Sequence, residues 1–209
     1  MRGSNGIFSV LLITDRRAVP DGTDLLSQVE RALDGDPEGL AILLRDKDLP
    51  FSDRASLGEP IRRAAADAGV PFLVHGDVAL TRALAADGLH VQDSAAARSL
   101  LQNADTSWIL GASCHSPTGI ADAANAGAHY ATLSPICPSP GKAAPGSQLG
   151  FGALAGPWPL PILALGGITP GHAAQAQASG AHGIAAIRAF LGAEDPASAV
   201  RSCLEALRW

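Results

Sequence analysis

Short apolar runs alternate along the whole chain with longer segments in which apolar residues recur at helical spacing. The apolar runs are continuous and do not alternate with polar residues, which is typical of strands buried on both faces of a parallel sheet. The pattern predicts eight strands, over residues 8–15, 39–46, 71–76, 88–92, 107–114, 129–136, 161–167 and 182–189.

The segments between these runs predict eight helices, over residues 23–33, 53–68, 78–85, 94–101, 117–126, 151–155, 170–179 and 196–207. Ser94 and Thr169 stand where N-terminal caps are expected, and Gly69, Gly127 and Gly180 stand where helices stop. Strict alternation of strand and helix predicts an α/β fold, a (β/α)8 TIM barrel in one domain over residues 1–209. An open doubly wound sheet is the alternative.

The composition excludes several classes of partner. With 47% hydrophobic residues, 17% charged residues and a net charge of −5, the chain is globular and has no basic surface for nucleic acid. Its three cysteines share no C-x-x-C spacing, so neither a zinc site nor a redox pair is expected. No apolar run approaches the roughly 20 residues that span a bilayer, and no signal peptide is evident. We therefore expect a cytoplasmic protein, and a homo-oligomer is left open.

Paired glycines after the seventh predicted strand carry the clearest functional signal. Gly166 and Gly167 lie between an apolar strand and a helix start, and the eighth strand runs into Ile187 and Arg188. Parallel barrels use the loops after strands seven and eight to present backbone N–H groups to a phosphate. These four residues therefore predict a site for a small phosphorylated ligand.

A barrel places its functional residues at the carboxyl ends of its strands. Arg45 and Lys47 follow the second strand two positions apart, so their side chains are expected to point the same way and to suit a phosphate or carboxylate. The alternative is a pair of surface cations that form ion pairs with Asp46 or Asp48.

Histidines stand at the ends of two predicted strands and inside a third. His115 follows the fifth strand just after Ser113, and an imidazole there suits proton transfer near neutral pH. The alternative is a polar residue that starts the next helix. His75 and Ser113 are predicted to contact the substrate, whereas His90 lies inside a strand and is predicted to be structural.

The loop after the sixth strand, residues 135–142, is stiffened by its prolines and could close over a ligand. Ser139 and Lys142 would then be its hydrogen-bond donors; an ordinary proline-rich surface loop is the alternative. Three strand-end carboxylates, Asp15, Asp77 and Asp93, could hold Mg²⁺, but Asp77 better suits a helix cap. No metal site is predicted.

The order and spacing of these segments resemble the thiamine-phosphate synthase and TenI superfamily of (β/α)8 barrels. The resemblance covers nearly the whole chain. It rests on Ile-Thr-Asp at 13–15, Leu-Arg-Asp-Lys at 44–47, Ala-Asp-Gly-Leu-His at 86–90, Leu-Gly-Ala-Ser-Cys-His at 110–115, Ser-Pro-Ile at 134–136 with Lys142, Ala-Leu-Gly-Gly-Ile at 164–168 and Gly-Ala-His-Gly-Ile-Ala at 180–185.

The synthase branch implies that a pyrimidine diphosphate ionises, that diphosphate leaves with Mg²⁺, and that the nitrogen of a thiazole phosphate captures the pyrimidine cation. Its members carry a Gln before the strand-two Arg, an Asn-Asp pair after strand three, an Asp in the strand-four loop and a Thr-x-Thr-Lys in the sixth loop. The matching positions here are Leu43, His75 with Gly76, Ala95, and the stretch that ends at Lys142. Asp77 or Asp93 would have to replace the missing carboxylates.

The TenI branch implies a thiazole tautomerase that moves a proton without a metal. Its members have a Gly after the strand-three Asn, a divergent strand-four loop and a Ser-x-His after strand five, which here resemble Gly76, Val91-Gln92 and Ser113 with His115. That histidine also occurs in synthases, and the TenI Asn is His75 here.

The resemblance therefore predicts a TenI-like enzyme of thiamine biosynthesis that binds thiazole phosphate. His115, Arg45 and Lys142 are the predicted catalytic residues. The predicted binding residues are Lys47, His75, Ser113, Ser139, Gly166, Gly167, Ile187 and Arg188. No cofactor is predicted for this activity. A Mg²⁺-dependent synthase and a non-catalytic barrel that binds a phosphorylated metabolite are the alternatives.

Overall fold

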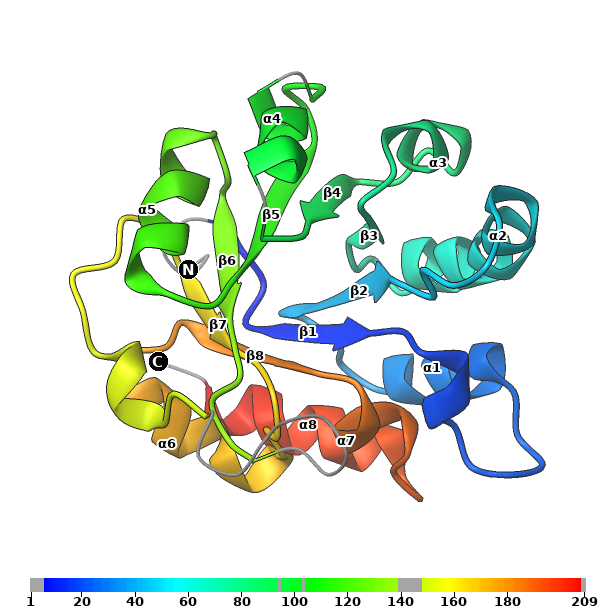
Figure 1. Ribbon diagram of the computed structural model, residues 1–209. Helices are drawn as coiled ribbons and strands as arrows, with labels where there is room; N and C mark the ends of the chain where they lie inside the picture. The colour runs from blue at the N-terminus through cyan, green and yellow to red at the C-terminus, as the bar shows by residue number, and fades with distance from the viewer. Residues whose placement is uncertain (1–5, 94, 103, 139–147, 208–209) are drawn as a thin grey trace.

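A computed structural model describes residues 6–93, 95–102, 104–138 and 148–207 of the chain. Eight parallel strands form a closed barrel in chain order, and the last pairs with the first through Val10 and Ile184 (Figure 1). Closure confirms the predicted single-domain TIM barrel and excludes the open sheet. The strands are β1 Val10–Ile13, β2 Leu40–Leu44, β3 Phe72–His75, β4 Gly88–Val91, β5 Ile109–Cys114, β6 Tyr130–Leu133, β7 Ile162–Ala164 and β8 Gly183–Ala186.

Helices surround the barrel on its outside (Figure 1). They are α1 Leu25–Leu33, α2 Phe51–Asp67, α3 Val78–Ala83, α4 Ala95–Gln102, α5 Pro117–Asn125, α6 Ala173–Ala178, α7 Arg188–Leu191 and α8 Pro196–Ala206, with 3-10 turns η1 Arg16–Ala18, η2 Phe151–Leu154 and η3 Pro170–His172. None of the helices in the described ranges is long and apolar enough to cross a membrane.

The predicted helix ends are largely confirmed. Gly69, Gly127 and Gly180 have φ angles of 69°, 94° and 106°, the left-handed conformation that ends a helix and favours glycine. Thr169 caps η3 through a capping box with His172. The predicted cap at Ser94 lies outside the described residues.

The largest differences from the predicted strand ends are at β6, β7 and β8, each of which ends three residues early. β6 ends at Leu133, because Pro135 has no N–H to donate to the sheet. β7 ends at Ala164, before the positive φ angles of Gly166 and Gly167. The predicted strand 182–189 is wrong beyond Ala186, because the chain turns into α7 and buries Phe190 and Leu191.

Two of the predicted helices also differ. Residues 151–155 form only the 3-10 turn η2, and residues 170–179 divide into η3 and α6. Both changes shorten the helical layer beside β7.

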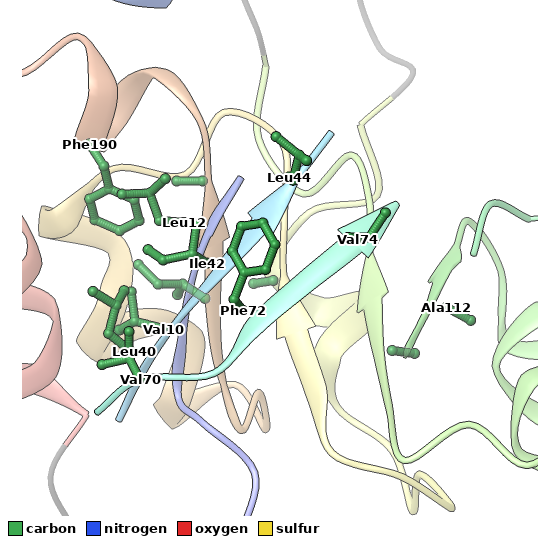
Figure 2. Close-up of a cluster of buried hydrophobic side chains, with 14 of the residues drawn as sticks. Val10, Leu12, Leu40, Ile42, Leu44, Val70, Phe72, Val74, Ala112 and Phe190 are labelled. Atoms are coloured by element: carbon green, nitrogen blue, oxygen red, sulfur yellow. The ribbon is translucent and has the colours of Figure 1, made fainter. Parts of the chain in front are cut away.

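Alternate strand residues divide the apolar side chains into two cores. The first lies between strands and helices, and Figure 2 shows members of it such as Val10, Leu12, Ile42 and Phe72. The second fills the barrel interior and comprises Phe8, Leu11, Ile13, Ala41, Leu43, Leu73, Tyr130, Leu163 and Ala185. Residues that continue the inward series past the strand ends therefore reach the mouth of the barrel.

Candidate active site at the carboxyl ends of the strands

A cavity of about 510 Å³ lies at the carboxyl ends of β2 to β5. Its lining is polar and consists of Arg45, Lys47, His75, Gln92, Asp93, Ser113 and His115. Arg45 and His75 stand two residues beyond the inward-facing Leu43 and Leu73, so the alternation of the strands explains their position. The structure thus brings together five predicted site residues, namely Arg45, Lys47, His75, Ser113 and His115.

The backbone of Arg45 is held by the end of β1. The Thr14 hydroxyl donates to the Asp46 carboxylate over 2.6 Å, and the Thr14 hydroxyl oxygen accepts the backbone N–H of Arg45 over 2.9 Å. Asp46 is buried and also accepts the backbone N–H of Arg16 over 2.8 Å. Asp46 therefore does not neutralise Arg45, contrary to one alternative expected from the sequence, but fixes the loop that carries it.

The Arg45 side chain forms a long ion pair with Asp15. Its Nη1 atom lies 3.9 Å from Asp15, which also pairs with Arg17. At this separation the carboxylate orients the guanidinium without a close hydrogen bond. Arg45 is half-buried and Lys47 is exposed, and both line the cavity, so the wall they form carries positive charge.

His75 presents a neutral imidazole to the cavity. Burial, followed by the nearby charges of Arg45, Lys47 and Arg54, lowers the pKa of His75 from 6.5 to about 4. At neutral pH the ring therefore has one N–H donor and one acceptor nitrogen. Arg54 reaches the same strand end from α2, where its Nη2 donates to the His75 carbonyl over 2.8 Å.

His115 is exposed, and its ring is oriented by the end of β6. Its Nδ1 atom lies 2.8 Å from the Ser134 carbonyl oxygen. A carbonyl only accepts, so Nδ1 must carry the hydrogen, and in the neutral ring Nε2 keeps its lone pair. This arrangement can accept and return a proton at Nε2.

Two of the three candidate carboxylates, Asp77 and Asp93, are placed differently. Asp77 caps α3 by accepting the N–H of Leu80 over 2.9 Å, as expected, and also lies 3.5 Å from Arg54. Asp93 lines the cavity, and its Oδ1 accepts from Arg98 over 2.6 Å. Of these two, only Asp93 reaches the cavity.

The donor set can be tested against Mg²⁺. The described residues contain no group of three or more His, Cys, Asp or Glu side chains that could hold a metal. Mg²⁺ is nevertheless commonly held by one or two carboxylates together with substrate phosphate oxygens. Asp93 fits this mode as the one cavity carboxylate in the described ranges, and the side chains fit a metal that binds mainly through a phosphorylated substrate.

The four residues after β7 and β8 do not line this cavity. Gly166 and Gly167 pack against the segment after β6, where the Cys137 N–H donates to Gly166 over 2.9 Å. Ile187 packs beside the interior core, and Arg188 is the exposed first residue of α7. The other predicted residues, Ser139 and Lys142, lie outside the described residues.

Two residues that line or support the cavity, Gln92 and Arg54, were not predicted as site residues. Gln92 follows β4 and lines the cavity, and its place at a strand end was the available signal. Arg54 supports His75 from the first turn of α2, and no local sequence pattern marks a helical arginine that reaches a neighbouring strand end.

These features define a TIM barrel with a polar, cation-walled cavity at the carboxyl ends of its strands. The chain belongs to the thiamine monophosphate synthase family, TMP-TENI, whose model matches residues 10–190. The superfamily expected from the sequence is confirmed.

Individual relatives agree. The thiamine-phosphate synthase of Roseiflexus castenholzii is 38% identical over 197 residues, which cover 92% of this chain and 85% of the relative. The thiamine-phosphate synthase of Moorella thermoacetica is 36% identical over 191 residues, which cover 88% of this chain and 89% of the relative. The solved structure of thiamine phosphate pyrophosphorylase from Pyrococcus furiosus superposes with a TM-score of 0.82 at 26% identity. The superposition covers 96% of this chain and 95% of that protein.

Proposed function

We propose that this protein is a thiamine-phosphate synthase, which joins a pyrimidine diphosphate to a thiazole phosphate. The observation that carries the proposal is the cavity itself, in which two cations and one carboxylate face the same space, in a chain whose relatives bear the synthase name. The sequence alone favoured the tautomerase and gave the synthase as an alternative, whereas the relatives favour the synthase.

The charged wall suits the diphosphate end of the first substrate. Arg45 offers a planar fork of donors and Lys47 a compact positive charge, and both stabilise a group that gains negative charge as it leaves. Thr14 and Asp46 hold the backbone of Arg45 in place before the substrate arrives. Such preorganisation costs no rearrangement during the reaction.

The reaction breaks the bond from the pyrimidine methylene carbon to a diphosphate oxygen and forms a bond from that carbon to the thiazole nitrogen. The electron pair of the broken bond leaves with diphosphate, and no proton has to move. Asp93 would hold Mg²⁺, which supplies positive charge to the diphosphate. His75, Ser113 and Gln92 supply neutral hydrogen-bonding groups to the rest of the cavity.

In this proposal the glycines after β7 bind the phosphate group of the thiazole phosphate. The N–H groups of Gly166 and Gly167 donate to no backbone carbonyl among the described residues. Free backbone donors at this position of a barrel suit a phosphate.

Incubation of the purified protein with both precursors and Mg²⁺ tests the proposal, with thiamine phosphate measured by mass spectrometry. We expect product with the wild type and at least a tenfold lower rate with Arg45→Gln. A folded protein that binds both precursors and forms no product would contradict the assignment.

A second function, thiazole tautomerase, is favoured by His115. The Ser134 carbonyl leaves Nε2 of His115 as a proton acceptor, and no proton acceptor is needed for the synthase step. Conversion of the thiazole carboxylate phosphate tautomer by the wild type and His115→Ala tests this candidate. Equal rates with the two proteins would eliminate it.

A further inference from the structure

Behind the cavity, a buried histidine connects a tyrosine to a serine. The Nδ1 atom of His90 lies 2.9 Å from the Tyr130 hydroxyl, and its Nε2 atom lies 3.0 Å from the Ser113 hydroxyl. Tyr130 and His90 are buried, with 0% and 2% of their surface exposed, whereas Ser113 lines the cavity. The three side chains come from β6, β4 and β5, so they form a hydrogen-bonded path from the barrel interior to the site.

Gly111 makes this path possible. It lies between His90 on β4 and Tyr130 on β6 in the strand register. A Cβ atom at Gly111 would collide with the Tyr130 ring, so the ring crosses β5 where that strand has no side chain. The Tyr130 ring also packs edge-on against Phe8, with centroids 5.0 Å apart, which keeps its hydroxyl directed at His90.

The direction of each hydrogen bond follows from counting protons. Burial lowers the pKa of His90 to about 3 and raises the pKa of Tyr130, so the imidazole is neutral and the phenol keeps its proton. Among the described residues, His90 Nδ1 is the one hydrogen-bond partner of the Tyr130 hydroxyl. If Tyr130 did not donate to it, a fully buried O–H would lack an acceptor, which is costly.

The remaining bond is then determined. Because Nδ1 accepts from Tyr130, the single hydrogen of the neutral ring lies on Nε2, and His90 donates to Ser113. The Ser113 oxygen accepts this bond, and its own hydrogen has no acceptor among the described residues. That hydrogen remains for a group in the cavity.

We propose that Tyr130 and His90 are positioning residues that set the Ser113 hydroxyl as a hydrogen-bond donor toward an acceptor atom of the bound ligand. The order of donation runs from Tyr130 to His90 to Ser113 to ligand. The ligand atom is an acceptor, such as a phosphate oxygen or an unprotonated ring nitrogen, and not an N–H or O–H group. The choice of ligand rests on the proposed function, whereas the order of hydrogen bonds does not.

Nitrogen NMR of the ligand-free protein, labelled at histidine with ¹⁵N, tests the order of donation directly. Protonated and unprotonated imidazole nitrogens have well-separated shifts, and the His90 signals are assigned through its own ring protons. We expect Nε2–H in the wild type, unchanged between pH 6 and 8. An Nδ1–H ring would overturn the proposal, whatever reaction the protein catalyses.

Calorimetric binding of thiamine phosphate tests the consequence for the ligand. Ser113→Ala and Tyr130→Phe should each weaken binding about three- to tenfold, the usual worth of one hydrogen bond. The double variant should bind as Ser113→Ala does, because Tyr130 acts through Ser113. Thr132→Val is the matched control, since it removes a buried hydroxyl on the same strand that has no hydrogen-bond partner, and it should bind within twofold of the wild type.

The outcomes separate the two proposals. Independent losses from Tyr130→Phe and Ser113→Ala, or no loss from Ser113→Ala, would overturn the positioning role. A wild type that does not bind thiamine phosphate would count against the proposed function, and the NMR result would still decide the order of the hydrogen bonds.

Discussion

The Nδ1 atom of His115 lies 2.8 Å from the carbonyl oxygen of Ser134, which makes Nδ1 a donor and leaves Nε2 to exchange protons. This contact separates the two candidate activities, since a tautomerase must move a proton and the synthase step moves none. A substitution at His115 can therefore distinguish them.

We expect His115→Gln to lower tautomer conversion about 100-fold or more, the usual contribution of a general acid–base group. Formation of thiamine phosphate should fall less than about tenfold, because glutamine keeps a polar side chain at the cavity rim. Steady-state rates for both reactions on the same preparations check this. A loss of both activities with unchanged binding of thiamine phosphate would contradict the expected separation.

Asp46 is the buried anchor of the Arg45 loop, and its replacement should affect both stability and binding. Asp46→Asn supplies only one acceptor oxygen for the Thr14 hydroxyl and the Arg16 N–H, so one donor loses its partner. We expect the free energy of unfolding to fall by about 1–3 kcal/mol, together with weaker binding of inorganic diphosphate. Urea unfolding and calorimetry measure the two effects.

Asp48→Asn is the control for this variant. Asp48 is exposed and also pairs with Arg16, but it does not contact Thr14. Its replacement should change both measurements less than Asp46→Asn does, because exposed ion pairs contribute little to stability. Equal effects would show that Arg16, and not the Thr14 contact, dominates the anchor.

Burial of His75 should make the stability of the native protein depend on pH. Its pKa is about 4 in the folded chain against an ordinary value of 6.5, so between these values the unfolded chain binds more protons. Stability should therefore fall as the pH is lowered from 6.5 toward 4, and His90 should add to the fall, since its pKa is about 3. Above pH 7 both rings are neutral in either state, and the effect vanishes.

Comparison of His75→Asn with the wild type isolates this contribution. Urea unfolding at pH 7.5 and at pH 5 should show a smaller loss of stability in the variant, by on the order of 1–2 kcal/mol. His115→Gln replaces an exposed histidine and serves as the control. An identical loss in His75→Asn and the wild type would mean that His75 does not contribute.

Much of the cavity follows from local sequence rules. Alternation along β2 and β3 points Arg45 and His75 inward, and the barrel topology brings strand ends together, so their meeting with Ser113 and His115 could be predicted. The lowered pKa of His75 could not, because it comes first from burial, which depends on how the chain packs around the end of β3, and then from nearby cations that include Arg54 of α2.

Other features depend on how strands and loops lie beside one another. The contact between His90 and Tyr130 requires the register of three strands and the absence of a side chain at Gly111. The apolar residues at 187–191 fit a strand or a helix in sequence, and only packing of Phe190 against the outer core selects α7. Periodicity alone does not separate such short apolar runs.

Gly167 should tolerate no side chain. Its φ of 64° is left-handed, and a Cβ atom would lie 2.7 Å from the Cys137 carbonyl oxygen. We expect Gly167→Ala to cost about 1–3 kcal/mol of stability and to weaken binding of thiazole phosphate, because the segment after β6 must shift. Gly152→Ala is the control, since its Cβ would meet nothing within 4 Å. Comparable losses of Tm in the two variants would contradict the steric argument.

Asp93 should set the Mg²⁺ requirement of the proposed synthase. It is the carboxylate that lines the cavity in the described ranges, so Asp93→Asn should raise the Mg²⁺ concentration for half-maximal activity at least about tenfold, because Mg²⁺ prefers charged oxygen ligands. Asp122→Asn is a matched control, since Asp122 also pairs with Arg98, over 3.3 Å, but does not line the cavity. Titration of Mg²⁺ after treatment with a chelator measures the effect at fixed precursor concentrations. If both variants shift the titration equally, the effect belongs to the position of Arg98, and if neither does, the metal is held without Asp93.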